Sequence, residues 1–162
     1  MLLLIPLVLV ALTVPSPRYE PSSPRYEPPV PGAVIERFRP PSCAWCPGNR
    51  GIDFATTPGE PVRASGPGVV TFAGTVGRDR FVVIAHPDGI RTTYAYLAGV
   101  RAVAGQGVAT GDVVGWAGAR LHLGARRGAT YLDPATLFRR QRVVPRLVPT
   151  AGTASRWARS AW

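Results

Sequence analysis

Short runs of β-branched and aromatic residues, separated by glycine-containing turns, constrain the fold of this chain more than any other feature. The runs are "PGVVTFAG" (67–74), "RFVVIAH" (80–86), "IRTTYAYL" (90–97), "DVVGWAG" (112–118) and "RLHLGAR" (120–126). They predict short strands, since no apolar pattern keeps a helical spacing for more than two turns. The stretch "HPDGI" predicts a hairpin turn, because proline presets φ and Asp-Gly tolerates positive φ. We therefore expect an all-β fold, an antiparallel sheet or sandwich.

One short helical turn is expected after these strands, at "DPATLF" (133–138). The Asp133 side chain can cap the first turn of a helix. Pro134 suits the first helical position, where its missing N–H costs no hydrogen bond. The folded region is therefore expected to end near residue 138.

Two segments are expected to precede the domain. Residues 1–14 contain the apolar run "LLLIPLVLVALTV", which is shorter than the ~20 residues that a membrane-spanning helix needs. This run is typical of a secretory signal peptide, with an uncleaved N-terminal anchor as the alternative, and both predict an extracytoplasmic protein. Residues 15–32 contain seven prolines and the hexapeptide "SPRYEP" twice, at 16–21 and 23–28. They predict an extended spacer, or alternatively a peptide ligand for another protein.

The positive charge is concentrated at the C-terminus. The formal net charge is +10, and all 19 basic residues are arginine. Residues 139–162 hold six arginines and no acid, whereas residues 33–138, the expected domain, hold eleven arginines and seven acids. The tail is expected to be disordered and to favour generic, salt-sensitive attraction to an anionic polymer or a membrane surface. Nucleic acid is not an expected partner, because the domain shows no nucleic-acid-binding motif.

The two cysteines, Cys43 and Cys46, stand in "CAWC". In a secreted protein this spacing favours a disulfide between them. A zinc half-site is the alternative, but the sequence has no second cysteine pair to complete it. A redox motif is not favoured, because no alternating βαβ pattern surrounds the pair.

One carboxylate and one histidine stand in glycine-rich, strand-like sequence: Asp53 in "GNRGIDF" and His122 in "RLHLG". A single histidine in a strand is more often structural than a ligand. Catalytic zinc needs three protein ligands and an open position for water. These two residues alone therefore do not define a metal site.

The order of motifs around these residues resembles peptidase family M23, the lysostaphin or LytM-like zinc endopeptidases of peptidoglycan. "GNRGIDFATTPGEPVRASGPGVVTFAG" is similar to the family's opening motif, and "VVIAHPDGIRTTYAYL" to its central hairpin. "GQGVATGDVVGWAG" and "RLHLGARRGATYLDPATL" resemble the last two motifs, including the His-x-His strand. The resemblance runs from Gly48 to about Phe138. It implies the family's β-sheet fold, of the duplicated hybrid motif type.

In active members of the family, zinc is held by a histidine, an aspartate four residues later and the second histidine of His-x-His. The metal polarises the scissile carbonyl and activates its bound water. Two further histidines handle protons and stabilise the oxyanion. The matching positions here are Asn49, Asp53, Tyr96, Arg120 and His122. Two zinc ligands, Asp53 and His122, therefore remain, and three of the five positions are replaced.

The replacements predict weak or absent zinc binding and no catalysis. The neutral amide oxygen of Asn49 is a poor zinc ligand. Arg120 stays protonated, so it repels a dication and cannot act as a base. Tyr96 can donate a hydrogen bond, but a phenol is a poor base at neutral pH.

Three functions remain open. The first is a secreted or envelope-associated module, without catalysis, that binds peptidoglycan or regulates a cell-wall hydrolase, as the LytM factors that activate amidases do. The second is an active zinc endopeptidase with Asp53, His122 and an unorthodox third ligand, for which a reduced Cys46 is the candidate. The third is electrostatic adhesion of the Arg-rich tail to anionic wall polymer or a membrane surface. His86 is expected to be a turn-stabilising or surface histidine rather than a ligand.

Overall fold

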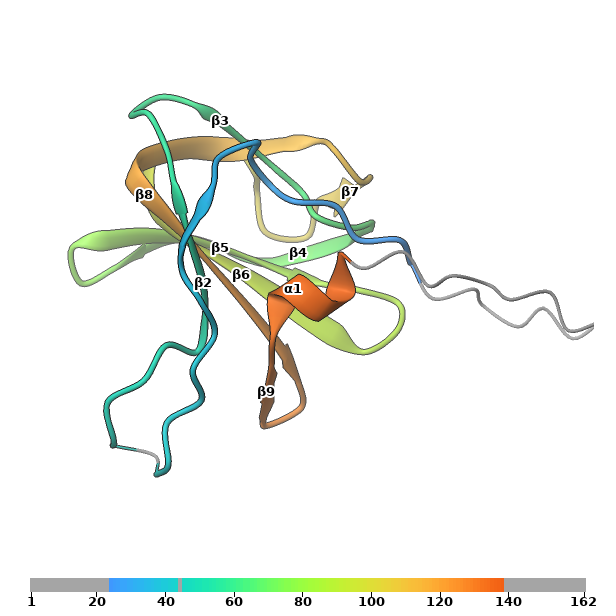
Figure 1. Cartoon of the computed structure of the whole chain (residues 1–162). Helices are drawn as coiled ribbons and strands as arrows, with labels where there is room; N and C mark the ends of the chain where they lie inside the picture. The colour runs from blue at the N-terminus through green and yellow to red at the C-terminus, as the bar shows by residue number, and fades with distance from the viewer. Residues whose placement is uncertain (1–23, 44, 139–162) are drawn as a thin grey trace, which may run out of the picture.

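A computed structural model describes residues 24–43 and 45–138, which form one antiparallel sheet and one short helix (Figure 1). The order of the strands is β1-β2-β8-β6-β5-β4-β7, and β3 and β9 pair with β8 outside this path. The all-β prediction is confirmed. The elements are β1 (Val34–Glu36), β2 (Gly51–Ala55), β3 (Pro61–Arg63), β4 (Gly68–Val76), β5 (Asp79–Ala85), β6 (Ile90–Val100), β7 (Gly107–Val108), β8 (Val113–Arg127), β9 (Thr130–Leu132) and α1 (Pro134–Leu137).

The predicted hairpin at "HPDGI" joins β5 to β6. Gly89 takes a φ of 80°, in the left-handed region that glycine adopts without strain. The turn is closed by the His86 N–H, which donates to the Ile90 carbonyl at 2.9 Å. Local turn chemistry therefore sets the register of this hairpin, as expected.

β8 differs from the prediction, because one strand replaces the two expected at 112–118 and 120–126. Gly118 lies inside this strand, where a Cβ would come within 2.8 Å of the Tyr96 carbonyl oxygen. The glycine therefore allows close approach of β6 rather than ending the strand. The first half of β8 pairs with β3 and the second half with β2 and β9, around the bend seen in Figure 1.

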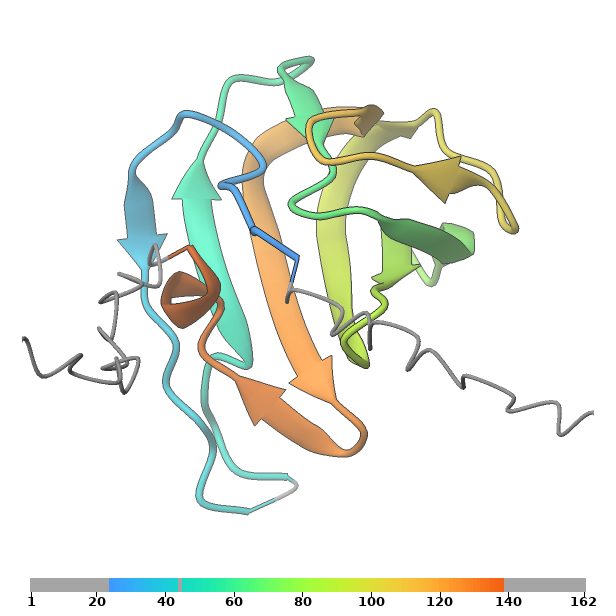
Figure 2. The ribbon, with the colours of Figure 1, turned by 90° about the vertical axis from the view of Figure 1, so that its right-hand side faces the viewer.

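The core lies on one face of the sheet. Along the second half of β8, Leu121, Leu123 and Ala125 are buried and alternate with residues that face the other side. The N-terminal segment and α1 both lie over the core face (Figure 2), and Val30 and Phe138 pack against its cluster. Each large aliphatic side chain buried there contributes about 1.5–3 kcal/mol. On the second half of β8, Arg120, His122 and Arg126 lie on the opposite face.

The folded region starts earlier than the composition predicts. Residues 24–32 fall within the expected extended spacer, but Tyr26, Pro29 and Val30 are buried against the domain. Proline-rich composition indicates an extended backbone, and an extended segment can still bury its side chains on a sheet. Part of the predicted spacer therefore packs on the sheet, while the division of the chain into a spacer and a domain at residue 33 stays a prediction. The predictions for residues 1–14, for most of the spacer and for the tail lie outside the described residues.

The predicted helical turn is confirmed. Asp133 is the N-cap of α1, its side chain accepts from the Ala135 N–H at 2.9 Å, and Pro134 is the first helical residue. α1 has four residues, and nowhere in the described part of the chain is a helix long and apolar enough to cross a membrane.

Candidate functional site

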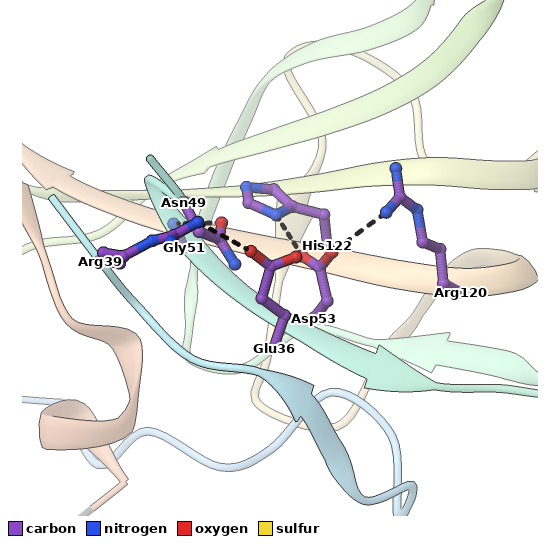
Figure 3. A network of polar contacts seen from close by, with 7 residues as sticks. All are labelled: Glu36, Arg39, Asn49, Gly51, Asp53, Arg120 and His122. Carbon is purple, nitrogen blue, oxygen red and sulfur yellow. Dashed lines mark hydrogen bonds and ion pairs between the residues drawn. The ribbon is translucent and has the colours of Figure 1, made fainter. Parts of the chain in front are cut away.

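Strands β2 and β8 bring Asp53 and His122 together. The two residues lie directly opposite each other in the antiparallel register, so their side chains point to the same face. His122 Nδ1 lies 2.5 Å from Asp53 Oδ1, and the ring N–H donates to the carboxylate. Asp53 is buried, with 4% of its surface exposed. The pair is shown in Figure 3.

The position of the His122 ring depends on Gly51. A Cβ on Gly51 would lie 2.8 Å from both Cε1 and Nε2 of His122, and closer still to the Leu123 carbonyl oxygen. A side chain at residue 51 would therefore displace the ring or the strand. This explains the second glycine of "GNRGIDF" as a packing requirement of the site.

Asn49 stands beside the pair, in the stretch that leads into β2. Its backbone is fixed by two hydrogen bonds with Arg39, of 2.8 and 2.9 Å. The side-chain Oδ1 accepts from the Gly51 N–H at 3.2 Å. The amide Nδ2 is buried and has no hydrogen-bond partner among the described residues. The amide oxygen is thus used inside the protein, and an unsatisfied donor faces the site.

Arg120 lies on the side of Asp53 away from Asn49 (Figure 3). Its Nη1 donates to Asp53 Oδ2 at 3.4 Å, a long hydrogen bond, and its side chain is half exposed. Its Cζ lies 4.3 Å from the centre of the Tyr96 ring, within the range of a cation–π contact. The guanidinium therefore lies between a carboxylate and an aromatic face.

Tyr96 has an unusual backbone. Its φ is 63°, and among the described residues it is the one non-glycine with positive φ. It lies in a β-bulge of β6 between Ala95 and Leu97, and such a conformation costs about 1–3 kcal/mol. The bulge directs the ring to the site, where it meets the His122 ring edge-on with 6.1 Å between centroids.

These residues do not fit a catalytic zinc ion. Such an ion needs three protein ligands, whereas the site offers one imidazole, one carboxylate and the neutral amide of Asn49. A guanidinium also occupies one oxygen of the carboxylate. Within residues 24–43 and 45–138, no three His, Cys, Asp or Glu side chains come together as metal ligands.

Cys43 and Cys46 are joined by a disulfide. Cys46 therefore has no thiolate to offer a metal. Next to it, Trp45 is 95% exposed, and it lines a shallow groove together with Cys46, Arg50 and Tyr131. The Arg50 Cζ lies 5.7 Å from the centre of the Tyr131 ring. Sequence reasoning did not single out Trp45 or Tyr131.

His86 is structural, but it is buried rather than at the surface. Its Nδ1 donates to the Pro67 carbonyl at 2.7 Å, and its Nε2 lies 2.8 Å from Thr92 Oγ1. Burial lowers the pKa of His86 below its ordinary value. Of the two expectations for this residue, the structural role is confirmed and the surface location is wrong.

The fold and the site together define the class of protein. The chain belongs to peptidase family M23, whose model matches residues 47–134. Members of this family are generally zinc-dependent peptidases. The family assignment made from the motifs is thereby confirmed.

Three curated proteins are similar in sequence to this chain. The uncharacterized protein Rv2891 of Mycobacterium tuberculosis is 41% identical over 123 residues, covering 67% of this chain and 49% of the relative. The DD-carboxypeptidase/endopeptidase Mpg of Neisseria meningitidis is 37% identical, covering 54% and 22%. The murein hydrolase activator NlpD of Salmonella dublin is 32% identical, covering 65% and 29%. The chain thus spans at most about half the length of these relatives.

A solved structure shares the fold. The catalytic domain of the antimicrobial peptidase lysostaphin from Staphylococcus simulans superposes with a TM-score of 0.59 and 21% sequence identity, covering 66% of this chain and 92% of that domain. At this identity the likeness concerns the fold alone.

Proposed function

We propose that this chain is an M23 domain without peptidase activity, which binds peptidoglycan or regulates a cell-wall hydrolase in the envelope. One observation carries the proposal: the Arg120 guanidinium pairs with Asp53, the residue that matches a zinc ligand of the family. A dication at Asp53 would have to displace this cation or lie beside it. Asn49 supplies no anionic or imidazole ligand to offset the repulsion.

The site suits binding of a carboxylate better than hydrolysis. Arginine binds carboxylates through charge-assisted, often bidentate hydrogen bonds, and half of the Arg120 side chain is exposed. The Arg120 guanidinium offers N–H donors at this half-exposed position. Peptide stems of peptidoglycan carry carboxylates, so they match these donors.

The relatives support this class of function. Mpg is named a peptidase, and NlpD is named an activator of murein hydrolases. The chain matches less than a third of the length of either protein, so their activities are carried over here only as part of the proposal. A secreted or envelope-associated location also rests on the apolar run at 2–14.

Zinc content tests the loss of catalysis. The chain is exposed to excess zinc, desalted and assayed by elemental analysis beside Asp53→Ala and His122→Ala, and each protein is offered a cross-bridge peptide. We expect no retained zinc and no turnover in any of the three. Near-stoichiometric zinc that both variants lose, with turnover that a chelator abolishes, would instead support the second function, an active endopeptidase.

Sedimentation with purified peptidoglycan tests the binding role. We expect Arg120→Ala to weaken binding several-fold, because it removes the exposed cation of the site. Arg78→Ala, in the exposed turn between β4 and β5, is the matched control and should bind like the unchanged chain. Equal binding by both variants would argue that peptidoglycan does not bind at the site formed by Asp53, Arg120 and His122.

The third function, adhesion through residues 139–162, has a separate test. Truncation after Phe138 should reduce the salt dependence of wall binding if the six arginines of the tail contribute. An unchanged salt dependence would remove this role. The Arg120 variant distinguishes the two contributions, since it leaves the tail intact.

A further inference from the structure

Tyr26 is held by the domain as an anchor side chain, although it lies in the proline-rich N-terminal segment. It is 5% exposed, and its hydroxyl donates to the Asp88 carboxylate, with Oδ1 at 3.0 Å and Oδ2 at 3.1 Å. Its ring meets the His86 ring edge-on, with 4.9 Å between centroids. Burial and the neighbouring Asp88 raise the pKa of Tyr26, so the phenol stays neutral and keeps its donor.

The backbone around Tyr26 is bound as well. The Glu27 N–H donates to the Ser65 carbonyl at 2.7 Å, and the Arg63 N–H donates to the Pro29 carbonyl at 2.9 Å. An extended segment with one buried aromatic anchor and backbone hydrogen bonds to its host is the usual form of a bound peptide. Residues 24–30 therefore occupy a peptide-binding site on the domain, which we name the Tyr26 site. It is formed by Ser65, His86, Asp88 and Ile90.

The chain contains a second copy of this peptide. Residues 16–21 and 23–28 have the same sequence, "SPRYEP", with Tyr19 at the position of Tyr26. We propose that residues 16–21 are an alternative occupant of the Tyr26 site in the same chain, so that the two copies exchange in one binding site.

The two copies differ in the residues on their C-terminal side. Tyr26 is followed by Pro29 and Val30, which are both buried, whereas the matching residues after Tyr19 are Ser22 and Ser23. Burying apolar surface is favourable and burying a hydroxyl without a partner is not. The copy at 23–28 is therefore the preferred occupant, and the copy at 16–21 is the minor one.

Exchange would change the reach of the N-terminal segment. The copies are offset by seven residues, which span about 20 Å in an extended proline-rich conformation. A tether this short also keeps the copy at 16–21 at a high local concentration, on the order of millimolar. When the copy at 16–21 is bound, the chain between the N-terminus and the domain is therefore shorter by about 20 Å.

Two identical tyrosines in identical hexapeptides provide a matched test in the full-length chain. The melting temperature is measured for Tyr19→Ala, Tyr26→Ala and the double variant. We expect Tyr19→Ala to melt like the unchanged chain, and Tyr26→Ala to be destabilised. The double variant should melt at least about 4 °C lower than Tyr26→Ala, because it has lost its substitute anchor. Equal melting of Tyr26→Ala and the double variant would overturn the proposal.

A free peptide gives an independent reading. The peptide of residues 16–23 should raise the melting temperature of the double variant in a saturable way, and its Tyr→Ala form should not. No rise with the unsubstituted peptide would overturn the proposal. The melting temperature of Tyr26→Ala should also be the same over a tenfold range of protein concentration. A dependence on concentration would mean that the hexapeptide of a second protein molecule fills the site. That result would contradict exchange within one chain.

Discussion

The two histidines of this chain use their ring nitrogens differently. His86 is 5% exposed, and both of its nitrogens are engaged, one with the Pro67 carbonyl and one with Thr92. His122 engages only Nδ1, with Asp53, and in the described part of the chain its Nε2 has no hydrogen bond. About a fifth of its side chain is exposed, at 21%. One histidine completes the core, and the other leaves a nitrogen available at the surface.

The groups around each histidine follow the same division. Near His86, the Tyr94 hydroxyl accepts from the Ser65 N–H at 2.7 Å and lies 3.3 Å from Thr92 Oγ1. Near His122, the Asn49 Nδ2 is buried and, among the described residues, without a partner. The Ser65 hydroxyl is an exception on the His86 side, since it too is unpaired within that part of the chain. The contrast predicts that the polar groups around His86 contribute more to stability than those around His122, where a buried amide has no partner among the described residues.

Restoring the missing ligand is expected to have the largest effect. Asn49→His supplies the third zinc ligand, and Arg120→His removes the competing cation. Zinc at 100 times its dissociation constant would then stabilise the variant by about 2.7 kcal/mol. The melting temperature should rise with zinc in the variant and stay constant in the unchanged chain. Adding Asp53→Ala should abolish the rise, and a rise in the unchanged chain would contradict the poor fit of its site to zinc.

A matched pair of tyrosines on β6 sharpens the comparison. Tyr94→Phe removes the acceptor of the Ser65 N–H in a buried place, and this should cost about 1–3 kcal/mol. Tyr96→Phe removes a hydroxyl that has no hydrogen bond among the described residues, so its effect should stay within about 0.5 kcal/mol. Urea unfolding at neutral pH measures both. A larger loss for Tyr96→Phe would reverse the assignment of stability to the His86 side.

The smallest effect expected is a change in pH dependence. Burial lowers the pKa of His86 in the folded state, so below about pH 6.5 the unfolded chain binds more protons and stability falls as the pH falls. His86→Gln removes the titrating group while keeping an amide near Thr92. The loss of unfolding free energy between about pH 7.5 and about pH 5.5 should be smaller in the variant. Equal losses would show that His86 is not protonated preferentially on unfolding.

Local chemistry determined which parts of the fold were predictable. The β5–β6 hairpin and the cap of α1 depend on neighbouring residues, so their motifs were sufficient. The continuity of β8 through Gly118 depends on Tyr96, which lies on another strand. The packing of Tyr26 depends on Asp88, 62 residues away, and composition alone could not show it.

The candidate site was predictable in its members but not in their contacts. Motif order identified Asn49, Asp53, Tyr96, Arg120 and His122. The placement of Arg120 between the carboxylate and the aromatic ring required the positive φ of Tyr96. Nothing in the local sequence predicts such a φ for a tyrosine, because the surrounding sheet imposes it.

The contacts of the three replaced positions also bear on what single substitutions to histidine would do. Asn and Tyr codons each lie a single-nucleotide change from a His codon, and so do two of the Arg codons. A lone return to histidine at Asn49 would still face the Arg120–Asp53 ion pair, and a lone return at Arg120 would remove the partner of the Tyr96 ring. Arg120 and Tyr96 thus depend on each other, so a histidine introduced alone at residue 120 loses an existing contact.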